Sequence, residues 1–237
     1  MQRVAFMTLG CKTNQYDAEY MREQFLRAGY APVDFDEIAD VYVVNTCMVT
    51  ATGERKSLKY VRQAARRNPQ ADIVVTGCVA QHEGEKLALP GVRLIVGNAR
   101  RREVVPLLER ARREGRALCA VEDLTSAPFE PLDVLANEGH TRAVMKIQEG
   151  CDNRCAYCII PEVRGPIRSR PVDEIAAEAQ SLAEAGFKEV VLTGIHLTSY
   201  GRDVKDGTTL LDAIRAAHDV PGIARVRIGS LGPVVVT

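Results

Sequence analysis

The chain has 237 residues, of which 46% are hydrophobic, and its 31 basic and 31 acidic side chains leave no net charge. This length suits two domains or one large one, and the balanced charge means that any contact with nucleic acid must come from local basic patches. The sequence has no apolar run near the ~18 residues of a membrane span and no secretory signal, so it predicts a cytoplasmic protein. In that compartment seven cysteines indicate metal binding or catalysis rather than disulfides.

The first half of the sequence alternates apolar, strand-like runs with segments of helical spacing. Strands are predicted at residues 3–10, 41–46, 72–77 and 92–98, and helices at residues 14–29, 54–69 and 101–115. Strands that alternate with helices favour a mostly parallel sheet. We therefore predict an α/β fold whose first domain, residues 1–125, is an open, Rossmann-like parallel sheet.

The segment that follows is rich in Pro, Asn and Gly, and we interpret residues 126–138 as a linker. The second predicted domain, residues 139–237, repeats a β/α pattern. Its strands are expected at residues 142–148, 189–194 and 224–230, and its helices at residues 171–186 and 209–218. This order is typical of a β/α barrel that stops after three strands, so we predict an incomplete partial barrel.

Three cysteines of the first domain each follow an apolar strand directly: Cys11, Cys47 and Cys78. Because ligands bind at the carboxyl ends of parallel strands, these thiols can converge on one point although 36 and 31 residues separate them. The alternative is three buried cysteines, a common fate for this residue type, but their shared position favours a metal site. Cys119 lies inside the run RALCAV and is predicted to be a buried core thiol.

A second group, Cys151, Cys155 and Cys158, has the spacing C-x-x-x-C-x-x-C. This differs from the C-x₂-C-x₂-C run of ferredoxins, which recruits a further cysteine. Zinc would require a fourth nitrogen or sulfur ligand, and the nearest histidine, His140, lies eleven residues upstream of Cys151. A 4Fe–4S cluster held by three thiolates leaves one iron open to chelate a substrate or cofactor.

The spacing of Cys151, Cys155 and Cys158 resembles the signature of the radical S-adenosylmethionine (SAM) enzymes. Together with the first triad, the chain resembles the radical SAM methylthiotransferases over essentially its whole length, in the segments LGCKTNQYDAE, VVNTC, TGCVAQ and GCDNRCAYCIIPEVRGPIRSR. Three subfamilies share this combination. The segments GCKTNQYDAE, KIQEGC and TGIHLTSYG are most similar to the type that acts on threonylcarbamoyladenosine in tRNA.

The resemblance implies two 4Fe–4S clusters. One, on Cys151, Cys155 and Cys158, would bind SAM at its open iron and pass one electron into the sulfonium, and an auxiliary one, on the first triad, would carry the sulfur to be inserted. It further implies insertion of a methylthio group at C2 of threonylcarbamoyladenosine beside the anticodon. No side chain is expected to be catalytic, because the cofactor carries the radical chemistry. The expected partners are tRNA and an external one-electron reductant such as flavodoxin or ferredoxin.

Further residues are candidates for binding roles. Tyr157 and Gly194 are predicted to lie beside the cofactor, although both have ordinary structural alternatives, and His196 is expected to be structural. Arg164 and Arg168 follow the second triad and are predicted to contact phosphate groups of the substrate, or the cofactor, together with Arg170. The helix at residues 54–69 is rich in basic side chains, for which a solvated face is the simpler interpretation.

The sequence departs from the family pattern at its C-terminal end. Family members complete a partial barrel and add a small RNA-binding β-domain, whereas this chain ends in IGSLGPVVVT, with Gly232 where relatives tend to have a glutamate. We therefore predict a C-terminally truncated chain that turns over poorly. The alternative enzymes act on isopentenyladenosine in tRNA or on an aspartate of a ribosomal protein. A noncatalytic iron–sulfur or zinc scaffold is the alternative from a different class.

Overall fold

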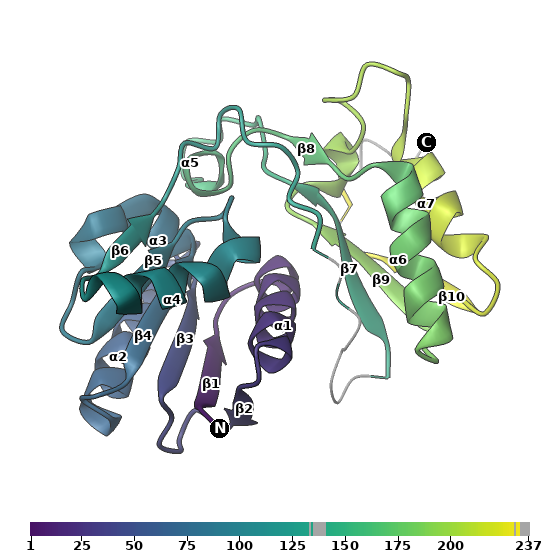
Figure 1. Cartoon of the computed structure of the whole chain (residues 1–237). Helices are drawn as coiled ribbons and strands as arrows, with labels where there is room; N and C mark the ends of the chain where they lie inside the picture. Colours follow the sequence, from purple (N-terminus) through teal and green to yellow (C-terminus); the bar gives the residue numbers. More distant parts are fainter. Residues whose placement is uncertain (133, 135–140, 230, 233–237) are drawn as a thin grey trace.

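The computed structural model describes residues 1–132, 134, 141–229 and 231–232. Within them, the first domain is built on a parallel sheet in the order β2-β1-β3-β4-β5-β6 (Figure 1). Its strands are β1 (Arg3–Thr8), β2 (Ala31–Val33), β3 (Val41–Thr46), β4 (Asp72–Gly77), β5 (Val92–Val96) and β6 (Leu118–Ala120). Every residue of β3 is buried, as expected for a central strand covered on both faces.

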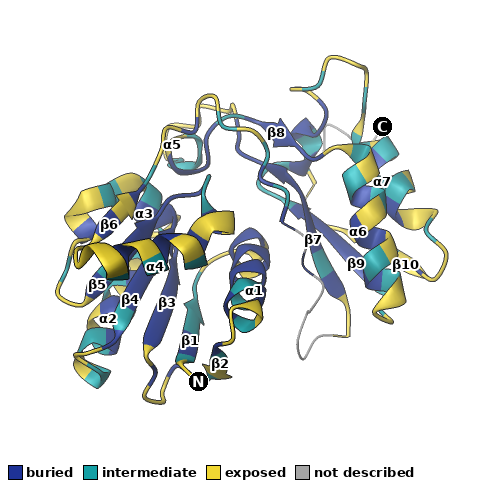
Figure 2. Cartoon of the chain, in the orientation of Figure 1, coloured by how far each residue is buried: buried dark blue, intermediate teal, exposed yellow. Residues whose placement is uncertain are grey.

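Helices cover both faces of this sheet. Helices α1 (Lys12–Arg27) and α4 (Val104–Glu114) pack on one face, and α2 (Ala51–Arg67) and α3 (Cys78–Glu83) pack on the other. Alternate strand residues supply the two cores: Val43 faces α1 and α4, whereas Val44 faces α2 and α3. Short 3₁₀ turns precede β5 (Gly84–Leu87) and α4 (Arg101–Glu103). Figure 2 shows the resulting buried strands between half-exposed helices.

The second domain has a sheet in the order β10-β9-β7-β8. Strands β7 (Ala143–Glu149), β9 (Glu189–Gly194) and β10 (Arg225–Ile228) are parallel, and the short β8 (Arg168–Ser169) pairs antiparallel with β7. Helices α6 (Val172–Glu184) and α7 (Leu210–His218) pack on one face. A short helix, α5 (Ile160–Arg164), follows the second cysteine group, and a 3₁₀ turn (Leu197–Ser199) follows β9.

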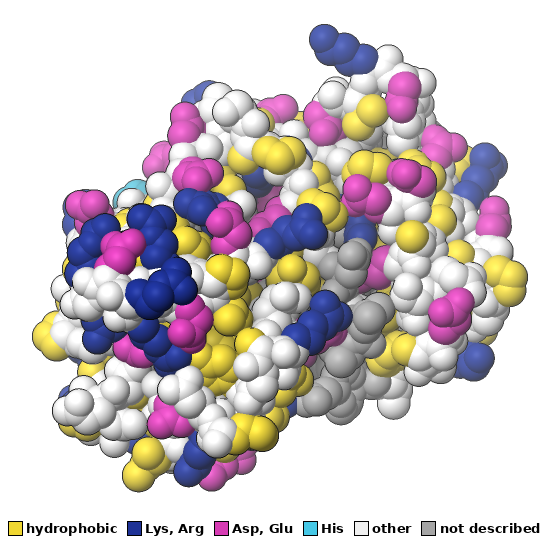
Figure 3. Space-filling model, in the orientation of Figure 1, with side chains coloured by type: hydrophobic (Ala, Val, Ile, Leu, Met, Phe, Trp, Pro, Cys, Tyr) yellow, Lys and Arg dark blue, Asp and Glu magenta, His cyan; other side chains and the backbone are white. Residues whose placement is uncertain are grey.

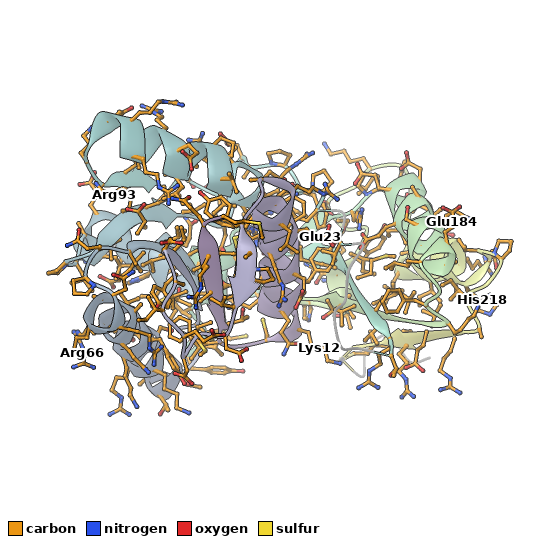
Figure 4. The ribbon with its side chains drawn as sticks, turned by 60° about the horizontal axis from the view of Figure 1, so that its bottom comes forward. Lys12, Glu23, Arg66, Arg93, Glu184 and His218 are labelled. Carbon is orange, nitrogen blue, oxygen red and sulfur yellow. The ribbon has the colours of Figure 1, made fainter. Side chains whose placement is uncertain are left out.

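Helix α1 lies between the two sheets (Figure 1). It packs on the first sheet through Tyr16, Met21 and Phe25, and Val144 of β7 contacts the same core from the second domain. In Figure 4, Lys12 and Glu23 on this helix lie between the domains, whereas Arg66 and Glu184 lie on opposite outer sides. A single helix therefore contributes to both domains, which fixes the sheets against each other.

The predicted α/β fold is confirmed, and each strand and helix predicted from periodicity is present, with the predicted bounds for β3, β4 and β9 and shifted ends for the others. The sequence missed β2, β6, β8, α3 and α5, which are too short to show a period. No helix among the described residues is long and apolar enough to cross a membrane.

Two expectations need correction or qualification. Cys119 is exposed, not a core thiol, because the pleat of the edge strand β6 turns Leu118 and Ala120 inward and the cysteine outward. Part of the predicted linker packs on the first domain, since Leu132 and Val134 are buried in its core. Other linker residues, 133 and 135–138, lie outside the described part of the chain, and the domain boundaries stay predictions.

Candidate functional site

The first cysteine triad lies along one edge of the first sheet. Cys11 connects β1 to α1, Cys47 follows β3, and Cys78 follows β4 as the first residue of α3. Because β1, β3 and β4 are neighbours in a parallel sheet, the fold brings these three residues to the same edge. The sequence prediction that they lie together agrees with this topology, and their role as metal ligands stays a prediction.

The three thiols lie close enough to affect one another electrostatically. Burial raises the pKa of the Cys47 thiol, and the charges of Cys78 and Cys11 raise it further, against opposing contributions from the Val49 backbone N–H and from Arg164. A Cβ placed on Gly10 would lie 2.8 Å from the Cys47 Sγ, so the loop that carries Cys11 passes directly over Cys47. Such crowding of thiols favours binding of a cation or cluster that takes up thiolate charge.

A set of buried hydrogen bonds fixes the loops that carry these cysteines. The Asn14 Nδ2 donates to the carbonyl oxygens of Leu9, at 2.7 Å, and Thr46, at 2.9 Å. The Thr46 Oγ1 accepts from the Val79 N–H at 3.0 Å and donates to the Thr76 carbonyl at 2.5 Å. These bonds join the residues before Cys11 and Cys47 to those on both sides of Cys78. The edge is therefore held by side chains that sequence reasoning did not single out.

A pocket of about 560 Å³ opens beside Cys11 and Cys47 and is also lined by Lys56 and Tyr60 of α2. Five cations of α2 are exposed: Arg55, Lys56, Lys59, Arg62 and Arg66. None of these five forms an ion pair with a carboxylate of the described residues. By contrast, the arginines that gather over α4 in Figure 3 have acidic neighbours, as in the 2.6 Å pair of Arg110 with Glu114. Helix α2 therefore carries unpaired positive charge to the rim of the first triad.

The second triad begins directly after β7. Cys151 is 9% exposed, whereas Cys155 is exposed and Cys158 is intermediate. The Cys151 N–H donates to the Gly165 carbonyl at 3.0 Å, and the Cys158 N–H donates to the Cys155 carbonyl at 3.0 Å. This turn brings the last two cysteines to one loop at the carboxyl end of β7, where β/α barrels place their ligands.

Neither triad forms a ready-made metal site. Within the described residues, no group of three or more His, Cys, Asp or Glu side chains is arranged to hold a metal ion. The residue types and placement nevertheless fit iron–sulfur clusters, because each triad supplies three thiols at one strand edge and leaves a ligand position open. The thiol side chains would need to reorient to reach the distances of ligands.

Glycines precede three of the six cysteines, and each has a positive φ: +100° at Gly10, +87° at Gly77 and +74° at Gly150. Side chains rarely adopt this conformation. A Cβ at Gly77 would lie 2.4 Å from the Thr46 carbonyl oxygen, and one at Gly150 would lie 1.7 Å from the Pro166 carbonyl oxygen. The Gly-Cys pairs therefore allow each cysteine to follow a tight turn against neighbouring backbone.

A second pocket, of about 570 Å³, lies where the two domains meet. Gln81 of the first domain lines it together with Cys151, Arg154 and Glu162 of the second. Its volume is in the range of small-molecule sites. The two cysteine triads are thus each beside a separate hollow, one on the edge of the first sheet and one between the domains.

Between the triads lies a buried ion-pair network. The Asp17 carboxylate of α1 contacts Arg101, the Lys146 Nζ at 2.5 Å and the Arg164 Nη1 at 3.0 Å. The Glu149 carboxylate contacts the same three cations. Burial alone would raise the pKa of both carboxyls, but these cations hold both pKa values below their usual range. The network joins α1, β7 and α5, and no sequence period indicated it.

The structure places the predicted binding residues unequally. Tyr157 is 92% exposed, so its predicted place beside the cofactor gains no packing support. Arg164 and Arg168 are buried, at 0% and 6% exposure, and do not present their guanidinium groups to solvent as a phosphate contact would require. Their predicted substrate contacts stay untested, and their burial favours a role inside the protein.

Gly194 and His196 lie at the carboxyl end of β9, beside the start of the second triad. A Cβ at Gly194 would lie 2.9 Å from the Gln148 Cβ, so packing against β7 already explains the glycine. The His196 N–H donates to the Gln148 Oε1 at 2.7 Å, and its ring contacts Ser199. These contacts agree with the structural role predicted for His196.

Comparison with protein families matches both domains. A family described as "Uncharacterized protein family UPF0004" matches residues 3–97, and the radical SAM superfamily matches residues 145–235. The first match contains the edge with Cys11, Cys47 and Cys78, and the second begins at β7 and contains the other triad. The chain therefore carries a UPF0004 domain followed by a radical SAM domain, and this combination supports a radical SAM methylthiotransferase.

Two similar proteins are threonylcarbamoyladenosine tRNA methylthiotransferases named MtaB. The one from Bacillus subtilis is 46% identical over 98% of this chain and 52% of the relative. The one from Aquifex aeolicus is 40% identical over 97% of this chain and 56% of the relative. The ribosomal protein uS12 methylthiotransferase RimO of Pelobacter propionicus is 34% identical over 96% of the chain and 52% of the relative. The chain therefore spans about half the length of these relatives.

Solved structures of the radical SAM methyltransferase TsrM from Kitasatospora setae share the fold. Two of them align with TM-scores of 0.55 and 0.56, over 92% and 93% of this chain and 50% and 54% of theirs. Their sequences are only 14% and 16% identical to this one. The likeness therefore confirms the arrangement of the sheets and says nothing about the substrate.

Proposed function

We propose that the protein is a tRNA methylthiotransferase that adds a methylthio group to C2 of threonylcarbamoyladenosine next to the anticodon. The observation that carries the proposal is the presence of two cysteine triads at the carboxyl edges of two sheets that share helix α1. The substrate choice is supported by the two MtaB relatives, at 46% and 40% identity.

In this proposal the two triads have separate roles. Membership of the radical SAM superfamily implies SAM and a 4Fe–4S cluster, for which Cys151, Cys155 and Cys158 are the candidate ligands. Cys11, Cys47 and Cys78 would hold a second, auxiliary 4Fe–4S cluster. The bound groups supply the electron, the radical and the sulfur. The protein supplies thiolates on two edges, glycines that let those edges turn, and a buried ion-pair network that holds the domains together.

The partners in this proposal are tRNA and an external one-electron reductant such as flavodoxin or ferredoxin. The chain has no net charge, so contact with tRNA depends on local positive charge. The exposed cations of α2, at the rim of the Cys11 and Cys47 pocket, are the described surface that best suits phosphate groups. This surface adjoins the proposed sulfur-donating site rather than the SAM site.

A second candidate substrate is an aspartate of a ribosomal protein, because RimO of Pelobacter propionicus is 34% identical over nearly the whole chain. Isopentenyladenosine in tRNA is a third. The alternative from another class, a noncatalytic iron–sulfur or zinc scaffold, would bind metal at one or both triads without transferring sulfur.

The test is deletion of the gene, followed by mass spectrometry of tRNA nucleosides and of the ribosomal protein. Loss of the methylthio group from threonylcarbamoyladenosine, with unmodified threonylcarbamoyladenosine accumulating, is expected. Complementation should restore it with the wild-type gene and with Cys119→Ala, an exposed edge cysteine, but not with Cys47→Ala or Cys155→Ala. A strain that keeps this nucleoside but loses methylthiolation of the ribosomal protein would make the RimO-type function correct instead.

A further inference from the structure

Arg164 belongs to the second domain, but its side chain is buried against the first. It ends α5, six residues after Cys158, and its relative exposure is 0%. Its guanidinium donates to the Asn14 Oδ1 and to the Asp17 Oδ2, both on α1, and to the Glu149 carboxylate on β7. A residue that follows the second cysteine group thus reaches the helix that begins directly after Cys11.

Asn14 connects Arg164 to the edge that carries the first triad. Its Nδ2 binds the carbonyl oxygens just ahead of Cys11 and Cys47, while its Oδ1 accepts from the Arg164 Nη2. A Cβ on Gly10 would lie 3.2 Å from the Asn14 Nδ2 and 2.8 Å from the Cys47 Sγ. The amide that Arg164 orients is therefore close to the Cys47 thiol.

The charge of Arg164 also acts on this edge. Burial alone would lower the pKa of Arg164, but the negative charges of Cys78, Glu149, Asp17 and Cys11 raise it well above its usual range. Within the described residues, its buried Nε has no hydrogen-bond partner. A buried N–H without an acceptor is unfavourable unless a ligand supplies one.

Arg164 differs from two neighbouring arginines in the charges around it, although the buried Nε of Arg168 also has no hydrogen-bond partner among the described residues. Arg101 is equally buried, but the charges that act on it most strongly are Asp17, Glu149, Glu130 and Arg164, with no cysteine among them. Arg168 is 6% exposed and donates to the Arg164 carbonyl at 2.6 Å, and again no cysteine is among its strongest charges. The three cations share one network, and Arg164 is the one that hydrogen-bonds to Asn14, which in turn holds the backbone ahead of Cys11 and Cys47.

We propose that Arg164 is a positioning residue for the group bound by Cys11, Cys47 and Cys78: it orients Asn14, whose Nδ2 holds the backbone ahead of Cys11 and Cys47, and it places a positive charge near that edge. Net charge and hydrogen bonds to sulfur set the reduction potential of an iron–sulfur cluster. A cation beside the cluster stabilises the reduced, more negative state. Arg164 therefore couples the domain that binds SAM to the potential of the auxiliary cluster. This inference rests on the proposed function, which assigns a cluster to the first triad.

The experiment isolates the auxiliary cluster by placing Cys155→Ala in this chain, followed by anaerobic reconstitution with iron and sulfide. In that background we compare Arg164→Met and Arg164→Lys with the matched variants Arg168→Met and Arg168→Lys. The measurement is the midpoint potential from a redox titration followed by EPR, with circular dichroism as the check on folding. We expect Arg164→Met to lower the midpoint potential clearly. Arg164→Lys should lower it less, because it keeps the charge and loses the planar fork, and the Arg168 variants should leave it nearly unchanged.

An unchanged potential in the Arg164 variants would overturn the inference, and so would equal shifts in the Arg168 variants. If Arg164→Met does not fold, the comparison of Arg164→Lys with Arg168→Lys decides the question alone. Iron in the Cys155→Ala parent with an unshifted potential would refute only the role of Arg164. A folded parent without iron would refute the auxiliary cluster of the proposed function, and with it this inference.

Discussion

Replacement of Asp17 by alanine is the sharpest test of what holds the two domains together. Asp17 is 1% exposed on α1, and its carboxylate contacts Arg101 of the first domain together with Lys146 and Arg164 of the second. The substitution leaves three buried cations to share the remaining carboxylates, Glu149 and Glu130. It should therefore destabilise the first domain and its contact with the second at once.

The expected loss of stability in Asp17→Ala is large because Asp17 and the three cations that contact it are all buried. Removing one member of a buried ion pair costs about 3–5 kcal/mol, since the other charge stays buried without compensation. An exposed pair provides the matched control: Asp36, 85% exposed, lies 2.7 Å from Arg67. Such pairs contribute at most about 1 kcal/mol. We expect Asp17→Ala to lower the free energy of unfolding by about 3–5 kcal/mol and Asp36→Ala to leave it nearly unchanged.

The assay is urea unfolding of the metal-free chain at pH 7 under reducing conditions, followed by circular dichroism. Asp17→Asn, which keeps the size of the side chain, separates the loss of charge from the loss of packing, and it should be nearly as unstable as Asp17→Ala. Equal stability of Asp17→Ala and Asp36→Ala would refute the reasoning, because the buried network would then contribute no more than a surface pair.

Three further predictions follow from named residues. Anaerobic reconstitution should load about eight irons per chain, as two 4Fe–4S clusters require, and Cys155→Ala should remove about half, whereas the exposed Cys119→Ala removes none. Burial would raise the pKa of Glu149, but the cations around it hold that pKa well below its usual range. The ionised carboxylate therefore stabilises the folded state at any pH above the unfolded-state pKa of about 4.3. The metal-free chain should therefore lose stability as the pH falls below about 4.3 towards the folded-state pKa, in thermal unfolding scans. Gly150→Ala should disrupt the turn before Cys151, because the new Cβ would lie 1.7 Å from a backbone oxygen, and it should lower the iron content by about half, since two cubanes share the total. Gly84→Ala is the control: its φ of +51° is also positive, but no atom lies within 4 Å of the new Cβ, so it should keep the full iron content.

Each of these has a result that would contradict it. Stoichiometric zinc, or iron unaffected by Cys155→Ala, would rule out the cluster assignment. Stability that stays constant as the pH is lowered from 5 to 3 would show that Glu149 is not held ionised by its neighbours. Equal iron content in Gly150→Ala and Gly84→Ala would mean that the turn before Cys151 tolerates a side chain.

The sequence predicted the strand edges because a local pattern defines them. Each of Cys11, Cys47 and Cys78 follows an apolar run, and adjacency of the strands then brings the cysteines to one edge. Gly-Cys pairs at the turns were equally visible in the sequence. The prediction failed at Cys119, where burial depends on the pleat of a short edge strand. No period indicated the burial of Leu132 either, because it lies in an irregular segment.

The sequence by itself determined the α/β order, the two cysteine triads and their attachment to strand ends, because hydrophobic period and ligand spacing act over a few residues. Only the tertiary structure decided what surrounds those triads. From the sequence alone, Arg164 is expected to be a cation available for binding after the second triad. In the structure it is buried and hydrogen-bonds to Asn14 and Asp17, near the start of the chain. Contacts between residues some 150 positions apart depend on how α1 packs between the sheets, and no local pattern encodes that packing.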